Sequence, residues 1–530
     1  MARQPRTVSN RPQGNPNTTG GPGSLVTFVR AEVRAHQEEY DKISDCLEGE
    51  VVIKKKGKTY LPAPDPLNTS SQNVERYNQY VVRAQFYNAT RRTLNGLLGE
   101  VFAVDPVITV PEELELVVED ANGEGVTAIQ QAVAATYNVL AYSRAGVLVD
   151  FPARPVDPAT GEPKAVSVAE VEEGDTHPLI FVYSGENIIN WRTMRRARKT
   201  VLTLVVLVEY VDQEADTIGF EIKTEKQFRV LRLDNKGEYY VQLWRENSAA
   251  PFATFFPRDA EGKRLNFIPF KFIGATKNTP EVEPPLFYDL ASLNVGHYRN
   301  SADYEESSFT VGQPTYCFGG LTKQWVKEVI GTRVEVGSRA AIALPEKGTA
   351  ELLQPNPNVM PKELMEMKER QMVALGAKLV ENKNVQETAT KVTMDQRTEN
   401  SILATAANNV STAFTWAFTV AAQFMGVKLP EKDADDALEF TLNTEFAIAK
   451  LAPEEQAQVI ASWQAGLISF SEARYLLKKS ALTSQKDEDA KKEIEEEQKA
   501  KEESEIRKIE AKKPPVAGGT TNPSGATKGV

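Results

Sequence analysis

The stretch "NSILATAANNVSTAFTWAFTVAAQFMGV", from Asn400 to Val427, contains no charged residue. Small and apolar residues recur in it every three or four positions, which predicts a helix from Thr393 to Met425, about 50 Å long at the standard rise. The face of that helix is formed by Leu403, Ala406, Val410, Ala413, Ala417, Ala421 and Phe424. Asparagine and glutamine side chains within the stretch argue against a membrane span. A helix with so little charge must therefore be surrounded by protein on most sides.

Two more helices are expected just before this one. A helix from Leu286 to Phe309 follows a pair of prolines, which suit the first helical turn, and a second helix runs from Pro361 to Val380. The segment between them, Val311 to Met360, is mixed and includes strand-like runs such as "GTRVEVG". A polar break, "ENKNVQETATK" at residues 381–391, separates the second helix from the long uncharged one.

The N-terminal third reads as helices. A helix from Leu25 would carry Val29, Val33, His36, Tyr40 and Ile43 on one face, and "VTAIQQAVAATYNVLAYSRAG" predicts another helix before a buried strand, "GVLVDFP". In "RRTLNGLLGEVF", Arg91 to Phe102, the helical face extends over Phe86, Thr90, Thr93, Leu97 and Val101. Gly96 and Gly99 each weaken an isolated helix by about 1 kcal/mol, so we expect a neighbour lying close against it.

From Leu179 to Ile273 the pattern changes to strands. Runs rich in β-branched and aromatic residues, such as "VLTLVVLVEYV", "KQFRVLRL" and "EYYVQLW", alternate with turn residues. Asp234-Asn235-Lys236-Gly237 is typical of a hairpin connection. Helical and β-rich stretches that follow each other in this way predict an α+β fold.

Composition restricts the class of protein. The chain has 530 residues and a net charge of -11; residues 483–530 hold 10 Lys and Arg against 11 Asp and Glu, so the acid excess lies in the body. Such a body should not bind nucleic acid tightly, because that affinity comes from cations that neutralise phosphates. Cys46 and Cys317 form no framework and are expected as free thiols. Residues 1–24 lack the apolar run of a signal peptide, and no run is long enough to span a bilayer.

Motifs for catalysis are weak. "KKKGKT" ends like a phosphate-binding loop, but Val52 occupies the position where the first glycine is needed. His36, His177 and His297 show no metal-binding spacing, and His297, Ser301 and Asp303 cannot form a triad, because residues six apart lie on different faces of a helix. "DADD" at 433–436 could hold a divalent cation, although an exposed acidic loop is the stronger interpretation. We expect no enzyme activity, no cofactor and no metal.

A series of motifs resembles the tailed-bacteriophage portal proteins. In chain order the motifs are "GEVVIKKKGKTYLP", "YNQYVVRAQFYNATRRTLNGLLGEVF", "AGVLVDFP", "ENIINW", "DLASLNVGHYRNSADYE", "ALGAKLVE" and "TATKVTMDQRTENSIL". The resemblance covers roughly residues 25–450, and its specificity lies in the order of the motifs. It implies an α+β portal-type fold with a mixed α/β wing, a two-helix stem, a small α/β clip, a long central helix and a helical C-terminal crown.

The resemblance also implies an organisation of the chain. In order, the segments would be a disordered N-terminal arm (1–24), a wing that is helical and then β-rich from about residue 179 (25–285), a first stem helix (286–310), a clip (311–360), a second stem helix (361–380), a tunnel loop (381–391), the long helix and wing return (392–450), crown-like helices (451–482), and a charged helix with a disordered tail (483–530).

The function implied by the resemblance is that of a ring of about twelve subunits at one capsid vertex. The ring would be the conduit for DNA packaging and ejection, and would dock the terminase and later a head-tail adaptor. It would contact capsid and scaffold proteins in a virion assembled in the host cytoplasm. Lys383, Asn384, Gln386 and Lys391 would be the channel loop facing double-stranded DNA. Leu403, Val410, Ala413 and Ala417 would pack the long helix between neighbours in the ring.

Two alternatives stay open. A nuclease or ATPase of the packaging machinery would need a carboxylate cluster or a nucleotide loop, and the sequence offers only weak versions of each. A ring-forming adaptor without a stem and clip would not need the helix, mixed segment and helix found between Leu286 and Val380.

Overall fold

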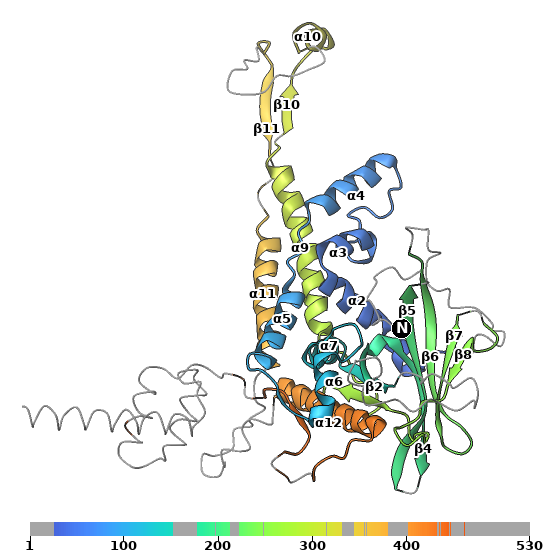
Figure 1. Cartoon of the computed structure of the whole chain (residues 1–530). Coiled ribbons are helices and arrows are strands. Elements are labelled where there is room, and N and C mark those ends of the chain that lie inside the picture. The colour runs from blue at the N-terminus through green and yellow to red at the C-terminus, as the bar shows by residue number, and fades with distance from the viewer. Residues whose placement is uncertain are drawn as a thin grey trace, which may run out of the picture. The chain divides into compact units, whose positions relative to one another are not determined.

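Helices and antiparallel strands occupy different stretches of this chain, which confirms the predicted α+β class (Figure 1). The computed structural model describes residues 26–151, 177–212, 222–330, 344–379, 401–446 and 461, except positions 197, 247, 314, 355, 357, 432, 433, 435 and 445. The chain divides into two units, Met1–Phe446 and Ala447–Val530. Apart from residue 461, the predicted N-terminal arm, tunnel loop, crown and tail lie outside the described residues.

Helices form the N-terminal part of the first unit. They are α1 (Ala31–Ala35), α2 (Gln37–Glu48), α3 (Glu50–Lys56), α4 (Ser71–Arg83), α5 (Ala89–Val101), α6 (Glu115–Glu119) and α7 (Ala128–Tyr142). Short polar side chains cap three of these helices: Ser70 Oγ accepts from Asn73 N before α4, Asn88 Oδ1 accepts from Arg91 N at 2.9 Å before α5, and Thr127 with Gln130 forms a capping box before α7. The prediction of a single helix from Leu25 is wrong. The segment forms two helices, α1 and α2, because the backbone of His36 between them, with φ -99° and ψ 5°, departs from helical geometry.

Two larger antiparallel sheets follow. Strands β2 (Arg144–Asp150), β3 (Leu179–Ser184) and β9 (Phe270–Gly274) form a sheet in the order β3-β2-β9. Strands β4 (Ile188–Arg196), β5 (Lys199–Asp212), β6 (Thr224–Leu233), β7 (Tyr239–Arg245) and β8 (Ala253–Phe255) form a second sheet in chain order. The predicted hairpin turn joins β6 to β7. Gly237 there has a φ of +83°, and Asp234 Oδ1 accepts from the backbone N of Lys236 and Glu238.

A buried ion-pair network joins the two sheets. Arg229 of β6 donates to Glu209 of β5 at 2.6 Å and to Asp150 of β2 at 2.9 Å, and Tyr183 of β3 donates to Glu209 at 2.6 Å. Burial raises the pKa of Asp150, whereas the charge of Arg229 lowers it. Because each buried charge is paired, the network fixes the sheets to each other, and removing a single partner would be costly.

The uncharged stretch forms α12 (Ile402–Met425), which is shorter than expected. Ser401 is extended and its Oγ accepts from Ala404 N, so this helix begins at Ile402, and residues 393–400 of the predicted helix lie outside the described residues. Gly426 ends it in a left-handed conformation. The helix packs against α7, β2, β9 and the short strand β12 (Glu439–Thr441), which pairs with β1 (Val107–Thr109). The expectation that protein encloses it is therefore confirmed on its apolar face.

Two long helices and a hairpin complete the unit. Helix α9 (Tyr288–Val311) packs along α11 (Met360–Lys378), and between them the chain forms β10 (Thr315–Gly319), the short α10 (Lys323–Trp325), a π-helical turn (Val326–Ile330) and β11 (Thr349–Leu353). Strands β10 and β11 pair antiparallel and extend beyond the ends of both helices (Figure 1). The two expected helices are confirmed within two residues at each end, and the names stem and clip stay predictions.

Candidate functional site

Helix α9 buries polar side chains that hold the connection between α4 and α5. Asn294, fully buried, accepts from Thr90 N at 3.1 Å and from Thr90 Oγ1 at 2.9 Å through Oδ1, and its Nδ2 donates to the carbonyl of Tyr87 at 2.7 Å. About two helix turns further along α9, Ser301 Oγ accepts from Gln85 N at 2.9 Å. These bonds give the Thr90 and Gln85 amides their acceptors, and they give the Tyr87 carbonyl a second donor beside Ala89 N.

Charged side chains extend this attachment toward the hairpin end of α9. Tyr80 Oη donates to Asp303 at 2.6 Å, Arg83 pairs with Glu306, and Arg299 Nε donates to the carbonyl of Tyr60 at 2.7 Å. Helix α9 is thus bonded to α4 and to the residues after α3 over most of its length. Sequence reasoning missed this role, although polar residues at positions 294 and 301 of a helix interior were visible in the motif "DLASLNVGHYRNSADYE".

Helix α11 is attached to α9 by two polar contacts. His297, which is buried, places Nε2 at 3.1 Å from Glu369 Oε1, and Lys368 donates to Asn300. Burial lowers the pKa of Lys368, and the nearby Arg299 lowers it further. Gly376 lies close to α5, because a Cβ at that position would stand 3.0 Å from Thr93 Cγ2. The absence of a side chain at Gly376 therefore allows α11 to approach α5 closely.

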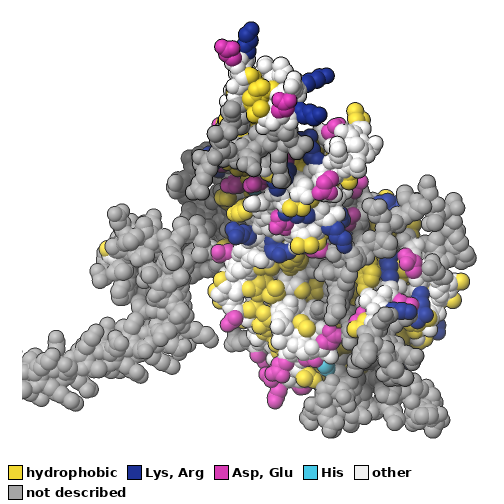
Figure 2. All heavy atoms as spheres, turned by 90° about the horizontal axis from the view of Figure 1, so that it is seen from above, with side chains coloured by type: hydrophobic (Ala, Val, Ile, Leu, Met, Phe, Trp, Pro, Cys, Tyr) yellow, Lys and Arg dark blue, Asp and Glu magenta, His cyan; other side chains and the backbone are white. Residues whose placement is uncertain are grey.

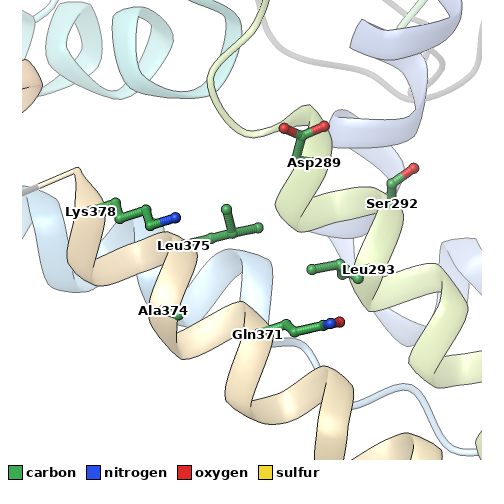
Figure 3. Close-up of a pocket in the computed structure, with 7 residues that line it drawn as sticks. All are labelled: Asp289, Ser292, Leu293, Gln371, Ala374, Leu375 and Lys378. Atoms are coloured by element: carbon green, nitrogen blue, oxygen red, sulfur yellow. The ribbon is translucent and has the colours of Figure 1, made fainter.

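An open groove of about 570 Å³ lies between α9 and α11 at the end far from the hairpin (Figure 3). Its lining consists of Asp289, Ser292, Leu293, Gln371, Ala374, Leu375 and Lys378. Asp289 and Lys378 lie at one end, and Leu293 and Leu375 point toward each other across it. These residues supply no nucleophile paired with a base and no set of metal ligands, so the groove has the chemistry of a packing surface.

Much of α11 and of the hairpin is open to solvent in the single chain. Within α11 only Pro361 and Met372 are buried, while Val373 is 73% exposed. Leu353 of β11 is 63% exposed. On the face shown in Figure 2, hydrophobic side chains lie open among charged ones. A folded chain seldom leaves several such apolar side chains together in water, so these surfaces are candidates for contact with another protein.

The four residues predicted to pack α12 against a neighbouring subunit require correction. Leu403, Val410, Ala413 and Ala417 are each 0% exposed within the single chain. They face the sheets and helices of their own subunit, so they cannot touch a neighbour. Sequence periodicity located the buried face of the helix, but it cannot tell a core in the same chain from an interface between chains. The exposed face of α12 is formed by Asn408, Thr412, Thr419 and Gln423.

The glycine prediction in α5 is also wrong. A Cβ at Gly96 or at Gly99 would meet no atom within 4 Å in the part of the chain that is described, and both residues are exposed. The helix instead buries its opposite face, with Leu94, Leu97 and Val101. Phe86 is buried but precedes the first residue of the helix.

The predicted channel residues Lys383, Asn384, Gln386 and Lys391 lie outside the described residues. The described residues stop at Leu379 and resume at Ser401. These two positions lie close together, because Leu403 N donates to the Leu379 carbonyl at 3.2 Å.

The residues weighed as catalytic are not brought together. His297 contacts Glu369 of α11, whereas Ser301 and Asp303 contact Gln85 and Tyr80, which lie just after and within α4. His36 is half-buried beside Glu39, and His177 Nε2 lies 2.9 Å from the Asp120 carbonyl. The run "KKKGKT" forms the end of α3 and one 3-10 turn. Within the described ranges no group of three or more His, Cys, Asp or Glu could hold a metal, and no helix has the length and apolarity to cross a bilayer.

Comparison with known proteins gives partial matches. Residues 285–425, which span α9 to α12, match a family described as a domain of unknown function (DUF4055). No curated protein matches the chain.

Three solved chains, each 13% identical to this one, come from gene transfer agent (GTA) particles. The first is from the neck of a native GTA particle computed with C12 symmetry (TM-score 0.36, covering 73% of this chain and 89% of that chain). The second is from the neck of an empty GTA particle computed with C6 symmetry (0.37, 74% and 90%). The third is from the virion of a native GTA particle (0.36, 82% and 99%). These TM-scores are too low to carry a function over to this chain.

Proposed function

We propose that this chain is a portal-type subunit of a phage-like particle, which assembles into a ring of about twelve copies around a DNA channel. The observation that carries the proposal is the order of elements from Tyr288 to Met425. In chain order these elements are a long helix, a small hairpin, a second long helix packed on the first, and a long uncharged helix whose start is hydrogen-bonded to the end of the second. This is the order that the sequence resemblance implies.

The exposed apolar side chains support assembly. Val373 on α11 and Leu353 on β11 lie on the elements that the proposal assigns to stem and clip. In a ring, each subunit presents two different surfaces to its two neighbours, so side chains exposed in the single chain become covered. With α9 and α11 as the stem, the hairpin β10–β11 would be the clip, which docks the terminase during packaging and the head-tail adaptor afterwards.

An acidic chain fits a conduit. Residues 1–482 hold 62 Asp and Glu against 52 Lys and Arg, so the body as a whole is net negative and does not hold phosphates tightly, which lets DNA slide through. Capsid and scaffold proteins would contact the β-rich wing. The virion would be the site of action, and the host cytoplasm the site of assembly.

We also propose that the chain is not an enzyme. The phosphate-loop candidate lacks its first glycine, and Lys58 lies on a 3-10 turn with its Nζ 5.7 Å from the centre of the Tyr77 ring. ATP turnover by the purified protein that disappears in Lys58→Ala would contradict this.

Assembly can be tested by light scattering on the purified full-length chain. Twelve chains of 58.6 kDa predict a particle of about 700 kDa. As a test of the covered surface, Val373→Asp and Leu353→Asp should each leave the helical circular dichroism unchanged and shift the protein toward monomer. The matched control is Glu363→Asp, an exposed change on the same helix α11. A monomer at every concentration, for the unmodified chain, would refute the proposal.

A further inference from the structure

An isolated group of cations lies at the end of the hairpin formed by β4 and β5. Arg192, Arg195, Arg196, Arg198 and Lys199 fall within eight residues that contain no acid, in a chain of net charge -11. All five are exposed. We call this group the arginine tip. In Figure 1 it is the end of the five-stranded sheet that lies below the label β4.

Within the part of the chain that the structure describes, no carboxylate neutralises the cations of the arginine tip. Among the described residues, none of the five forms an ion pair with a carboxylate, whereas Arg229, Arg245 and Arg264 in the same sheet region do. The nearest turn, Asp234–Gly237, lies against Arg196, because a Cβ at Gly237 would stand 2.7 Å from Arg196 Nη2. Asp234 is already occupied by Arg264 and by two backbone amides, and Lys236 adds an exposed cation.

Contacts around Trp191 of β4, next to the first residue of the arginine tip, hold this strand in place. Trp191 is buried, and the Arg30 and Arg144 guanidinium carbons lie 4.3 and 4.1 Å from its ring centre. Arg30 also covers the outer edge of β4, donating from its backbone N to Ile189 O and from Nη1 to Trp191 O. Beyond Trp191 no strand pairs with that edge in the part of the chain that is described. The cations therefore stand on a fixed strand with a free edge.

We propose that the arginine tip binds the phosphate backbone of double-stranded DNA, as a contact separate from the predicted channel loop. Guanidinium groups bind phosphate oxygens through two parallel hydrogen bonds, and such contacts need no particular base sequence. A protein partner would be expected to use an apolar centre, and among the described residues of the tip the one exposed apolar side chain is Met194, which is 47% exposed. This surface therefore fits a repeating anion better than a folded protein.

Binding should be measured on the full-length chain by fluorescence anisotropy with a labelled duplex of mixed sequence, between about 50 and 200 mM salt. The test variant is Arg192→Gln/Arg195→Gln/Arg198→Gln, which spares Arg196 against the turn. The matched control is Lys55→Gln/Lys58→Gln/Lys362→Gln, which removes the same charge from exposed positions elsewhere. The melting temperatures of both variants should stay close to that of the unmodified chain.

The test variant should bind at least about tenfold more weakly at low salt, and the slope of log K against log salt should fall by about 2.7, because each lost phosphate contact contributes about 0.9. The control should keep most of the affinity and slope. Equal losses in both variants would overturn the proposal, since net charge alone would explain them. Equal binding of polyglutamate at matched charge would overturn the choice of DNA over an acidic protein. Neither readout requires ring assembly, so the portal proposal can fail while this one holds.

Discussion

Replacing Asn294 by alanine should destabilise the chain far more than an ordinary polar-to-alanine change. Its amide is fully buried and makes three hydrogen bonds, two accepted from Thr90 and one donated to Tyr87 O. Alanine would leave two buried groups of Thr90, its backbone N and its hydroxyl, without their acceptor, whereas the Tyr87 carbonyl still accepts from Ala89 N. Each buried group without a partner costs about 1–3 kcal/mol, so, allowing for relaxation of the Thr90 hydroxyl, we expect a loss of about 2–4 kcal/mol in the free energy of unfolding.

Ser301→Ala provides the comparison, because Ser301 satisfies only one backbone amide, Gln85 N. It should cost about 1–3 kcal/mol. Asn408→Ala, on the exposed face of α12, should cost little. Urea unfolding followed by circular dichroism gives the free energies, and hydrogen exchange should show faster exchange of the Thr90 amide in Asn294→Ala and of the Gln85 amide in Ser301→Ala. If Asn294→Ala is no worse than Asn408→Ala, the account of α9 as the helix that fastens the segment between α4 and α5 is wrong.

Four further predictions concern other parts of the molecule. Ala413→Asp or Ala417→Asp should bury an unpaired charge in the core of the single chain and abolish folding. The control Thr412→Asp, on the exposed face of α12, should fold, and far-ultraviolet circular dichroism of the three variants measures the helix content that distinguishes them. Cys317 is exposed and Cys46 is buried, with burial raising the pKa of the Cys46 thiol to about 12, so an aromatic disulfide reagent should titrate one thiol in the native chain and two after denaturation. The unfolded chain releases the Cys46 proton near pH 9.0 and the folded chain does so only near 12, so this thiol should lower the stability progressively between those values, and Cys46→Ala should flatten that fall. Lys383→Ala/Lys391→Ala should leave ring assembly intact and change genome retention in particles more at low than at high salt; unchanged retention under both conditions would mean that the segment is a surface hinge.

Local signals in the sequence located most of the helices and turns. The α9 and α11 helices begin and end where the prolines and the apolar spacing predict, because these signals act within a few residues. The turn Asp234–Gly237 is correct for the same reason, since Gly237 takes a positive φ.

The periodicity of the sequence could not show which surface packs against a given helix face. The apolar face of α12, including Ala413 and Ala417, was expected to meet another subunit but packs inside its own chain. Gly96 and Gly99 indicated a close neighbour, yet the described part of the chain leaves them in the open. Both errors have one cause: burial can be read from a pattern, but which surface provides it depends on contacts far apart in the sequence.

Side chains that bond across long sequence separations were also missed. Asn294 and Ser301 act on residues more than 200 positions away, so nothing in their own neighbourhood shows the role. The arginine tip is different. Its run "RTMRRARK", residues 192–199, was visible as a block of like charge, and the structure adds that no carboxylate among the described residues pairs with it.

Electron microscopy of the purified full-length protein tests the central claim most directly. The account predicts end-on views of closed rings of about twelve subunits around an open channel, with α9 and α11 crossing the narrow part of the ring and the hairpin β10–β11 at one end. A particle without a central channel, or a ring in which the α9–α11 pair lies on the outer rim, would contradict it.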